Sequence, residues 1–365
     1  MSSKHIAFFL SELHGGGAQR VTINLIKALS ERGLKVDLVL AKAEGAYLDQ
    51  IPPQTRLIDL QAATLLRSFP KLVSYLKQNE PEYLIAGLHG ASLLAIWSKS
   101  FTNVRTKIAV VIHNTFSVEA KSYKSLRRRI IPSLVNYLYP KADLLIAVSQ
   151  GVAQSMADAL DLPTSQIKVI YNPVVTSELK QKAKASTTHP FFSTPYPVIL
   201  GVGRLTLAKD FATLIRAFAK VRQKQEAKLC ILGEGEDRKD LEALIKKLNL
   251  ESDVSLPGFV NDPYAYMSQA TLFVLSSLWE GLPTVLIEAM ACGTNVVATD
   301  CPSGPREILA GGKYGKLVAT QDSEALANAI LDTIAMPINS EILRSRAEDF
   351  SQSRICDRYL EVFNN

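Results

Sequence analysis

The sequence predicts an α/β protein with two doubly wound domains that face each other across a cleft. Its 365 residues are too many for one ordinary domain and suit two. Short aliphatic runs alternate with helix-length amphipathic segments from end to end, which indicates parallel sheets covered on both faces. The alternation lapses once, between Pro173 and Pro197, where prolines and polar residues gather.

Strand-like and helix-like segments can be assigned in order. In the first half we expect strands at 5–11, 36–41, 56–60, 83–88, 107–113, 143–149 and 167–172, and helices at 18–33, 66–78, 121–139 and 151–160. In the second half we expect strands at 198–203, 228–235, 254–259, 271–277, 295–300 and 316–319, and helices at 210–225, 237–249, 284–293, 322–335 and 340–363. The stretch 176–197 is predicted to be the interdomain linker.

Composition argues against several classes of protein. No run approaches the ~18 apolar residues of a membrane span, and the N-terminal apolar run is shorter than the roughly 7–15 residues of a secretory signal. The four cysteines are scattered, which favours a reducing compartment. Residues 1–190 carry 23 basic against 13 acidic side chains, and residues 191–365 carry 18 against 22. This asymmetry predicts that the first half binds a negatively charged partner, either a membrane surface or a phosphate-bearing substrate. We do not expect nucleic acid as the partner, because no basic run is interleaved with aromatic residues.

A glycine-rich loop, HGGGAQR (14–20), follows the first predicted strand and opens the first helix. Ligands of doubly wound sheets bind at such loops. Consecutive glycines let the backbone approach a ligand closely, and a helix N-terminus offers unpaired N–H groups to a phosphate. The loop lacks the G-x-G-x-x-G pattern of dinucleotide sites, so we interpret it as a phosphate contact or, alternatively, as a flexible turn.

A second strand-to-helix loop, GVGRLTLAKDF (201–211), carries two cations. Arg204 offers a planar guanidinium and Lys209 a compact ammonium, and together they are suited to gripping a diphosphate. Asp210 is predicted to be the N-cap of the next helix. Taken alone, two cations in a loop are more often simply solvated.

The segment LWEGLPTVLIEAMACG (278–293) changes that judgement because it supplies carboxylates. Glu280 lies in a predicted loop, and Pro283 suits the first turn of the next helix. Glu288 falls in an apolar stretch of that helix, where an unpaired carboxylate is costly, and ribose hydroxyls would satisfy it. The alternative is an ordinary exposed glutamate.

Taken together and in this order, the motifs resemble those of the retaining glycosyltransferases of family 4, which have the GT-B fold. The resemblance covers essentially the whole chain and rests on glycines 15–17, a strand ending in His113, G-x-G-R-L…K-D (201–210), L-G-E-G-E (232–236), L-P-G-F-V (256–260), the E-x7-E pair at 280 and 288, and S-G-P-R-E-I (303–308). The last motif is similar to that of bacterial lipopolysaccharide and lipid-linked oligosaccharide transferases. Arg306 makes it a variant of the commoner G-x-P-E.

The resemblance implies a role for each matching residue. The catalytic set is His113 at the reacting face of the donor sugar, Glu280 on that sugar, and Arg204 and Lys209 on the departing diphosphate. The set that binds the rest of the donor is Gly16 and Gly17 beside the diphosphate, Gly233, Glu234, Phe259 and Val260 around the base, Gly281, Leu282, Pro283 and Thr284 on the sugar, and Glu288 on the ribose.

The resemblance also implies the organisation and the reaction. Residues 1–175, with about 345–365 returning as a crossing C-terminal helix, would bind the acceptor, and residues 198–344 would bind the donor. A sugar would move with retention from a nucleoside-diphosphate sugar, by preference a UDP-sugar, to a hydroxyl of a saccharide or lipid-linked saccharide in cell-envelope glycan assembly. We expect no cofactor and no metal, because fixed cations take over the leaving charge and the chain has no Asp-x-Asp site.

The acceptor side leaves alternatives open. Residues 121–140 join a basic cluster to apolar and tyrosine side chains, which suits either an anionic membrane surface or an ordinary solvated face. The enzyme is thus expected in the cytoplasm, with peripheral attachment to the inner face of the plasma membrane as one option. Two other functions compete: a hydrolysing nucleotide-sugar 2-epimerase of the same fold, and a non-catalytic subunit that binds a nucleotide sugar.

Overall fold

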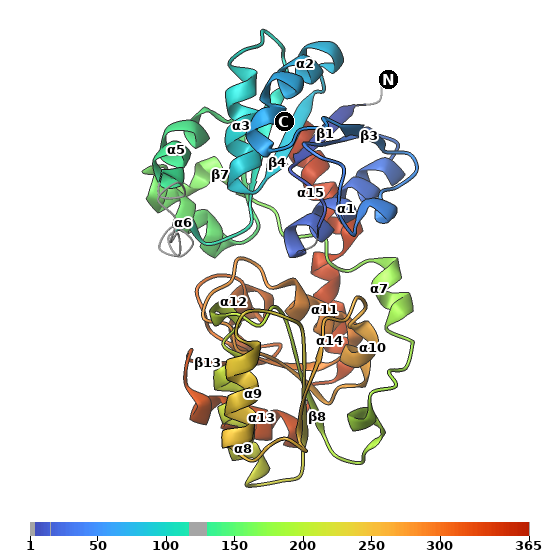
Figure 1. Ribbon diagram of the computed structural model, residues 1–365, viewed down its shortest axis with the longest axis vertical. Helices are drawn as coiled ribbons and strands as arrows, with labels where there is room; N and C mark the ends of the chain where they lie inside the picture. The colour runs from blue at the N-terminus through green and yellow to red at the C-terminus, as the bar shows by residue number, and fades with distance from the viewer. Residues whose placement is uncertain (1–3, 15, 117–129, 365) are drawn as a thin grey trace. The chain divides into compact units, whose positions relative to one another are not determined.

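The computed structural model describes residues 4–14, 16–116 and 130–364, and these form two compact units (Figure 1). The first unit comprises Met1–Pro173 and Gln352–Asn365, and the second comprises Val174–Ser351. Each contains one sheet whose described strand pairs are all parallel, with helices packed against it. The predicted fold class, two doubly wound Rossmann-like domains, is confirmed.

The first unit has a seven-stranded sheet in the order β3-β2-β1-β4-β5-β6-β7. Its strands are β1 His5–Leu10, β2 Lys35–Leu40, β3 Arg56–Asp59, β4 Tyr83–Gly87, β5 Lys107–Ile112, β6 Leu144–Ala147 and β7 Ile167–Val169. Its described α-helices are α1 Gly17–Glu31, α2 Phe69–Asn79, α3 His89–Lys99, α5 Ile131–Leu138, α6 Gln150–Leu160 and α15 Gln352–Asn364. The strand order reverses between β1 and β4, both of which are almost wholly buried, as the apolar runs predict.

The second unit has a six-stranded sheet in the order β10-β9-β8-β11-β12-β13. Its strands are β8 Val198–Val202, β9 Lys228–Leu232, β10 Val254–Gly258, β11 Leu272–Leu275, β12 Asn295–Thr299 and β13 Lys316–Val318. Its α-helices are α7 Ser177–Lys182, α8 Phe211–Arg222, α9 Arg238–Lys247, α10 Tyr264–Gln269, α11 Thr284–Cys292, α12 Pro305–Ile308, α13 Ser323–Ala335 and α14 Ser340–Ala347. Here the order reverses between β8 and β11.

Apolar side chains from one face of the second sheet pack against α8, α9 and α13 to form one core. Phe218 of α8 and Ile330 of α13 are fully buried in it. Burying a side chain of this size contributes about 1.5–3 kcal/mol. This core fixes the strands whose carboxyl ends carry the predicted site, so the loops there start from rigid positions.

The boundaries of the units differ from those expected. Residues 176–197, predicted as the linker, lie in the second unit. Although their composition is polar, they make specific side-chain contacts with other residues of that unit. The Nε2 atom of His189 lies 3.0 Å from the Ser255 hydroxyl, and the Phe192 ring meets Tyr266 edge-on. The stretch therefore packs on the second sheet instead of spanning between domains.

The last predicted helix, 340–363, is two helices, and the chain returns to the first unit at residues 351–352, not near 345. Ser351 has an extended backbone that bridges to Val175, and the Phe350 carbonyl accepts a hydrogen bond from the N–H of Val174. This extended stretch separates α14 from α15. Only α15 lies in the first unit, where it packs on α1 (Figure 1). The helix α3 is an element that the sequence analysis does not predict.

Candidate active site

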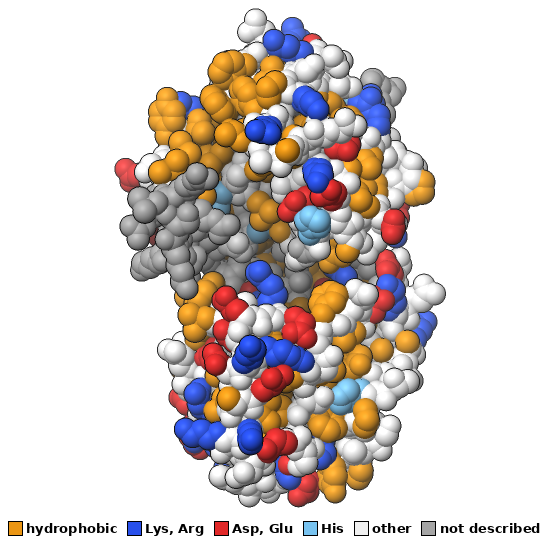
Figure 2. Space-filling model, in the orientation of Figure 1, with side chains coloured by type: hydrophobic (Ala, Val, Ile, Leu, Met, Phe, Trp, Pro, Cys, Tyr) orange, Lys and Arg blue, Asp and Glu red, His pale blue; other side chains and the backbone are white. Residues whose placement is uncertain are grey.

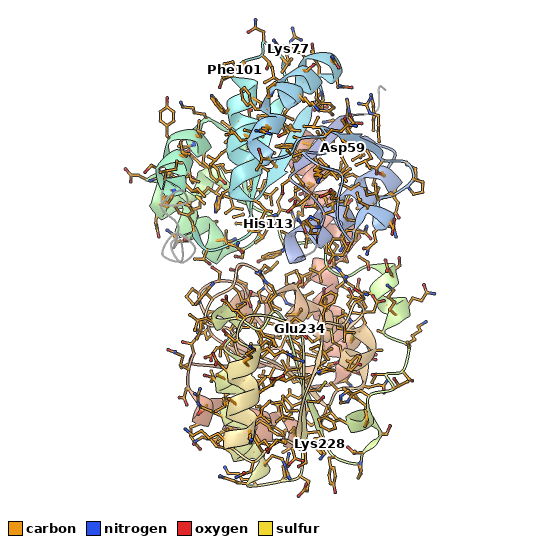
Figure 3. The ribbon with its side chains drawn as sticks, viewed as in Figure 1. Asp59, Lys77, Phe101, His113, Lys228 and Glu234 are labelled. Carbon is orange, nitrogen blue, oxygen red and sulfur yellow. The ribbon has the colours of Figure 1, made fainter. Side chains whose placement is uncertain are left out.

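The predicted residues of the second unit gather at one edge of its sheet, around the point where the strand order reverses. The loops after β8 and β11 carry Lys209 and Glu280, and the next loop, after β9, carries Glu234. Figure 3 shows Glu234 at this edge and Lys228, the first residue of β9, at the opposite edge. Ligands of doubly wound sheets bind outside the carboxyl ends of the strands at such a reversal.

Lys209 and Glu280 form an ion pair at this edge. The Lys209 Nζ lies 2.5 Å from Glu280 Oε1, and the Ser277 hydroxyl donates to the same oxygen at 2.6 Å. The side chains of Lys209 and Glu280 are only 22% and 11% exposed. A charge held in a site of low polarity acts more strongly on a ligand than the same charge in water.

Hydrogen bonds between the two loops hold this pair in place. The Ser276 hydroxyl donates to the carbonyl of Lys209 at 2.7 Å, and the N–H of Leu278 donates to the carbonyl of Ala208 at 2.8 Å. The Asp210 side chain accepts from the N–H of Thr213, so its predicted role as the N-cap of α8 is confirmed. Because the bonds cross from one loop to the other, the ammonium is positioned before any ligand arrives.

Ser276 and Ser277, which follow β11 directly, are two further residues of this site that the motifs do not predict. A signal for them exists, since the apolar run of that strand ends in two hydroxyl side chains at the carboxyl edge of a buried strand. The partner of Ser276 lies 67 residues away in the loop after β8, so sequence spacing does not reveal that contact, whereas the partner of Ser277 is Glu280, three residues on in the same loop.

Glu288 lies inside α11 and is only 6% exposed, so the alternative of an ordinary exposed glutamate is wrong. Gly281, Leu282 and Pro283 are buried in the loop before α11, and Thr284 is the first helical residue. A buried carboxylate is stable only with hydrogen-bond donors around it. Its presence in α11 makes this helix a candidate for ligand binding as well as for packing.

The segments predicted to line a base pocket end the two neighbouring strands. Gly233 and Glu234 follow β9, and the N–H of Gly233 donates to the carbonyl of Gly258, the last residue of β10, at 2.8 Å. Phe259 is 71% exposed and Val260 is half-buried. An aromatic side chain held at the surface beside a strand end offers a flat face for stacking.

Among the described glycines, Gly233 is the one where an added Cβ would approach another atom most closely. Its φ is +146°, and a Cβ there would lie 1.9 Å from the carbonyl oxygen of Gly203, in the loop that carries Arg204. We expect Gly233→Ala to lower the free energy of unfolding by more than about 3 kcal/mol or to prevent folding.

The control is Gly312→Ala, where φ is +105° but nothing lies within 4 Å of the added methyl. That variant should lose only about 1–2 kcal/mol, the cost of the backbone conformation. Thermal and urea unfolding of the two variants measures the difference. Equal losses would show that contact with Gly203 is unimportant.

Arg204 and Arg306 have exposed side chains at the same edge. Arg204 lies two residues beyond the end of β8. Among the hydrogen bonds of the described residues, none joins its guanidinium to Lys209 or Glu280. Arg306 binds the Asp300 carboxylate through its Nε at 3.1 Å, just beyond β12. An exposed guanidinium remains available to a ligand, so the prediction that Arg204 binds a diphosphate stays a prediction.

In the first unit the predicted residues follow β1 and β5. Gly16 is the N-cap residue of α1 and Gly17 its first residue, with no side chain capping the helix, while Gly15 lies outside the described residues. His113 follows β5, and Figure 3 shows it at the end of the unit opposite Lys77 and Phe101. Burial, with a smaller effect from the charge of His89, lowers the pKa of His113 to about 4. At neutral pH the imidazole is uncharged and acts as a hydrogen-bonding group.

Within residues 4–14, 16–116 and 130–364, no three His, Cys, Asp or Glu side chains are arranged to hold a metal ion. The carboxyl edge of the second sheet offers a fixed ammonium, two carboxylates with low exposure and the exposed guanidinium of Arg204. Such a set can bind an anion that carries hydroxyl groups and stabilise negative charge that develops on it.

Comparison with known proteins gives matches across the chain. Residues 186–350 match the profile of the family described as glycosyl transferases group 1, and residues 15–178 match that of glycosyltransferase family 4. A 4-α-N-acetylgalactosaminyltransferase of Campylobacter jejuni, named for its diphospho-undecaprenol-linked substrate, is 32% identical over 88% of this chain and 87% of its own. The lipopolysaccharide core biosynthesis glycosyltransferase LpsE of Rhizobium meliloti is 27% identical over 95% of both chains.

Solved structures share the fold. Sucrose-phosphate synthase from Thermosynechococcus elongatus aligns with a TM-score of 0.81 and 22% identity, covering 99% of this chain and 98% of that one. Anabaena HepE in complex with UDP-glucose aligns with a TM-score of 0.79 and 23% identity, covering 99% of both chains. The architecture of each unit is therefore that of the GT-B enzymes.

Proposed function

We propose that this chain, which belongs to glycosyltransferase family 4 and is therefore a sugar-transferring enzyme, uses a UDP-sugar donor and retains the configuration of the transferred sugar. The acceptor is a hydroxyl of a saccharide or a lipid-linked saccharide, and the product enters a cell-envelope glycan. The observation that carries the proposal is the Lys209–Glu280 pair, tied between two loops at the reversal of the second sheet.

The choice of donor and acceptor is supported by the relatives and neighbours. The Campylobacter relative is named for transfer to a lipid-linked diphosphate, and LpsE is named for lipopolysaccharide core biosynthesis. HepE, which shares the fold, was solved with UDP-glucose. Family membership leaves the epimerase without support, and Lys209, Glu280 and Glu288 are all present, which argues against a non-catalytic subunit.

The site residues act on the bond that breaks. The bond between the anomeric carbon and the diphosphate oxygen breaks, and the acceptor oxygen bonds to the carbon on the same face. The acceptor proton passes to the departing phosphate. Lys209 and Arg204 stabilise the negative charge that grows on the diphosphate, and Lys209 needs little reorganisation because its loop and its ammonium are already held in place.

The proposal assigns the remaining contacts of the donor to residues that the family resemblance singles out and whose burial is compatible with those roles. Glu280 accepts hydrogen bonds from sugar hydroxyls while its other partners, Lys209 and Ser277, hold it in place. Glu288 accepts from the ribose, and Phe259 stacks on the base. His113 and the N-terminus of α1 belong to the other unit, so the proposal requires both units to act on one donor molecule.

The enzyme works without a metal in this proposal, because protein cations take the role that a divalent ion has elsewhere. Transfer rates in EDTA and in added Mg²⁺ or Mn²⁺ should agree within twofold. A loss of more than tenfold in EDTA that returns with the metal would contradict this part of the proposal.

We further propose that residues 121–140 face an anionic membrane and that the enzyme works in the cytoplasm at the inner face of the plasma membrane. Residues 121–129, which hold most of the basic cluster, lie outside the described residues. In the described part, Ile130, Leu134 and Tyr137 are exposed, and Figure 2 shows hydrophobic side chains gathered over α3 and α5. Each basic residue near such a surface contributes about 1 kcal/mol. Of the described helices, none is long and apolar enough to cross a membrane.

The test is a thermal-shift screen of nucleoside-diphosphate sugars, followed by product analysis with saccharide acceptors. We expect UDP-sugars to raise the melting temperature, Glu288→Ala to abolish that shift, and NMR of the product to show the anomeric configuration of the donor. Inverted product would contradict retention. An epimerised free sugar, or binding with no turnover on any acceptor, would support one of the rival functions.

A further inference from the structure

His89 connects three segments of the first unit. It is the first residue of α3, and its Nδ1 lies 2.7 Å from the hydroxyl of Tyr139, which begins the turn after α5. Its ring meets the Phe116 ring edge-on, with centroids 5.4 Å apart. Tyr139 is only 1% exposed and Phe116 is also buried. Since Phe116 lies three residues after His113, one side chain ties the loop of His113 to α3 and to the end of α5.

The backbone just before His89 is strained. Leu88 has φ of +68°, a conformation that costs a non-glycine residue free energy and persists only where the surroundings enforce it. The N–H and the hydroxyl of Ser92 both donate to the Leu88 carbonyl at 3.0 Å, and Ser92 is fully buried. Strain of this kind is concentrated where a side chain must be held at a set position.

His113 lies against the same turn. A Cβ on Gly87, the last residue of β4, would be 3.0 Å from the Nε2 atom of His113, so the imidazole rests on the backbone directly before Leu88. The turn follows β4, where the strand order of the first sheet reverses between β1 and β4. This reversal is the place where a doubly wound sheet binds its ligand.

We propose that His89, fixed by its hydrogen bond to Tyr139, is a positioning residue for His113. It holds the loop 113–116 against α3 and so sets the direction of the His113 imidazole. The inference rests on the proposed function insofar as His113 acts at the donor sugar. A displacement of about 1 Å in such a group is enough to lower turnover by orders of magnitude.

Tyr139→Phe tests the hydrogen bond with the smallest change. We expect kcat to fall about tenfold while the donor KM stays within twofold and the melting temperature drops only slightly, because one hydrogen bond contributes about 1 kcal/mol. His89→Asn, whose amide can still bond the tyrosine hydroxyl, should keep more activity than His89→Ala. The control is Tyr75→Phe, which removes a buried hydroxyl elsewhere in the unit and should lower stability without changing kcat more than twofold.

A double-mutant cycle with His113→Ala separates positioning from a general loss of stability. If His89 and Tyr139 act through His113, Tyr139→Phe has no further effect once His113 is removed. The proposal would be overturned if the decreases in kcat caused by Tyr139→Phe and His113→Ala multiplied in the double mutant. A Tyr139→Phe variant with wild-type kcat would overturn it as well.

A measurement that needs no activity distinguishes this inference from the proposed function. The imidazole NMR signals of His113, assigned by their loss in His113→Ala, should shift in Tyr139→Phe and stay unchanged in Tyr75→Phe. Unchanged His113 signals in Tyr139→Phe would overturn the positioning role whatever the enzyme transfers. A chain that transfers no sugar while these signals shift would instead count against the proposed function.

Discussion

Replacing Lys209 by alanine should lower kcat at least tenfold and leave the fold intact. The ammonium is positioned by the loop contacts of Ser276 and paired with Glu280 at 2.5 Å, at the edge where the leaving diphosphate is expected. Its charge stabilises the transition state more than the bound donor, because the negative charge on the diphosphate grows as the bond breaks. Steady-state kinetics with saturating donor, alongside thermal unfolding, measures the two effects separately.

The matched control is Lys220→Ala on α8, whose side chain is 38% exposed. Lys220 pairs with Glu324 at the surface, and exposed pairs of this kind contribute about 0–1 kcal/mol. This variant should keep wild-type kinetics and stability. Wild-type kcat for Lys209→Ala would remove Lys209 from the mechanism.

Asp37→Ala should be the most destabilising charge removal in the first unit. Asp37 on β2 is fully buried and accepts from His5 at 2.9 Å, from Arg56 Nε at 2.9 Å and from the Tyr75 hydroxyl at 2.7 Å. Removing the carboxylate leaves these donors without their acceptor. We expect the free energy of unfolding to fall by about 3 kcal/mol, at the low end for a buried pair because the Arg56 side chain is half exposed. Urea unfolding measures the loss. The control is Asp357→Ala, an exposed partner of Arg32, which should cost less than about 1 kcal/mol.

The same carboxylate predicts a pH dependence. Burial by itself would raise the pKa of Asp37, but the hydrogen bonds from His5, Arg56 and Tyr75 outweigh it and hold the pKa well below its usual range. Its contribution to stability is therefore complete above the unfolded pKa of about 4 and decreases as the pH falls toward the folded value. The difference in stability between the wild type and Asp37→Asn should shrink from pH 5 to pH 3. A constant difference would show that Asp37 does not titrate as described.

Much of the fold follows from local sequence pattern. The continuous apolar runs predict the buried parallel strands, Asp210 is recognisable as an N-cap, and Glu288 stands out as a carboxylate inside an apolar helix. These features depend on a few neighbouring residues or on one helical face, so the sequence carries them directly.

Contacts between distant segments account for what the sequence analysis does not predict. The support of Lys209 by Ser276 joins residues 67 positions apart, and the bond from His89 to Tyr139 joins residues 50 positions apart. The helix α7 lies in a stretch whose polar composition resembles a linker. In each case the deciding partner comes from another element, and only the folded chain brings the two together.

A structure of the enzyme with UDP bound would test the central claim most directly, because that claim assigns the diphosphate to cations of the second unit. We predict diphosphate oxygens within hydrogen-bonding distance of Arg204 and Lys209, and ribose hydroxyls on the Glu288 carboxylate. A nucleotide that binds away from Arg204 and Glu288 would contradict the account.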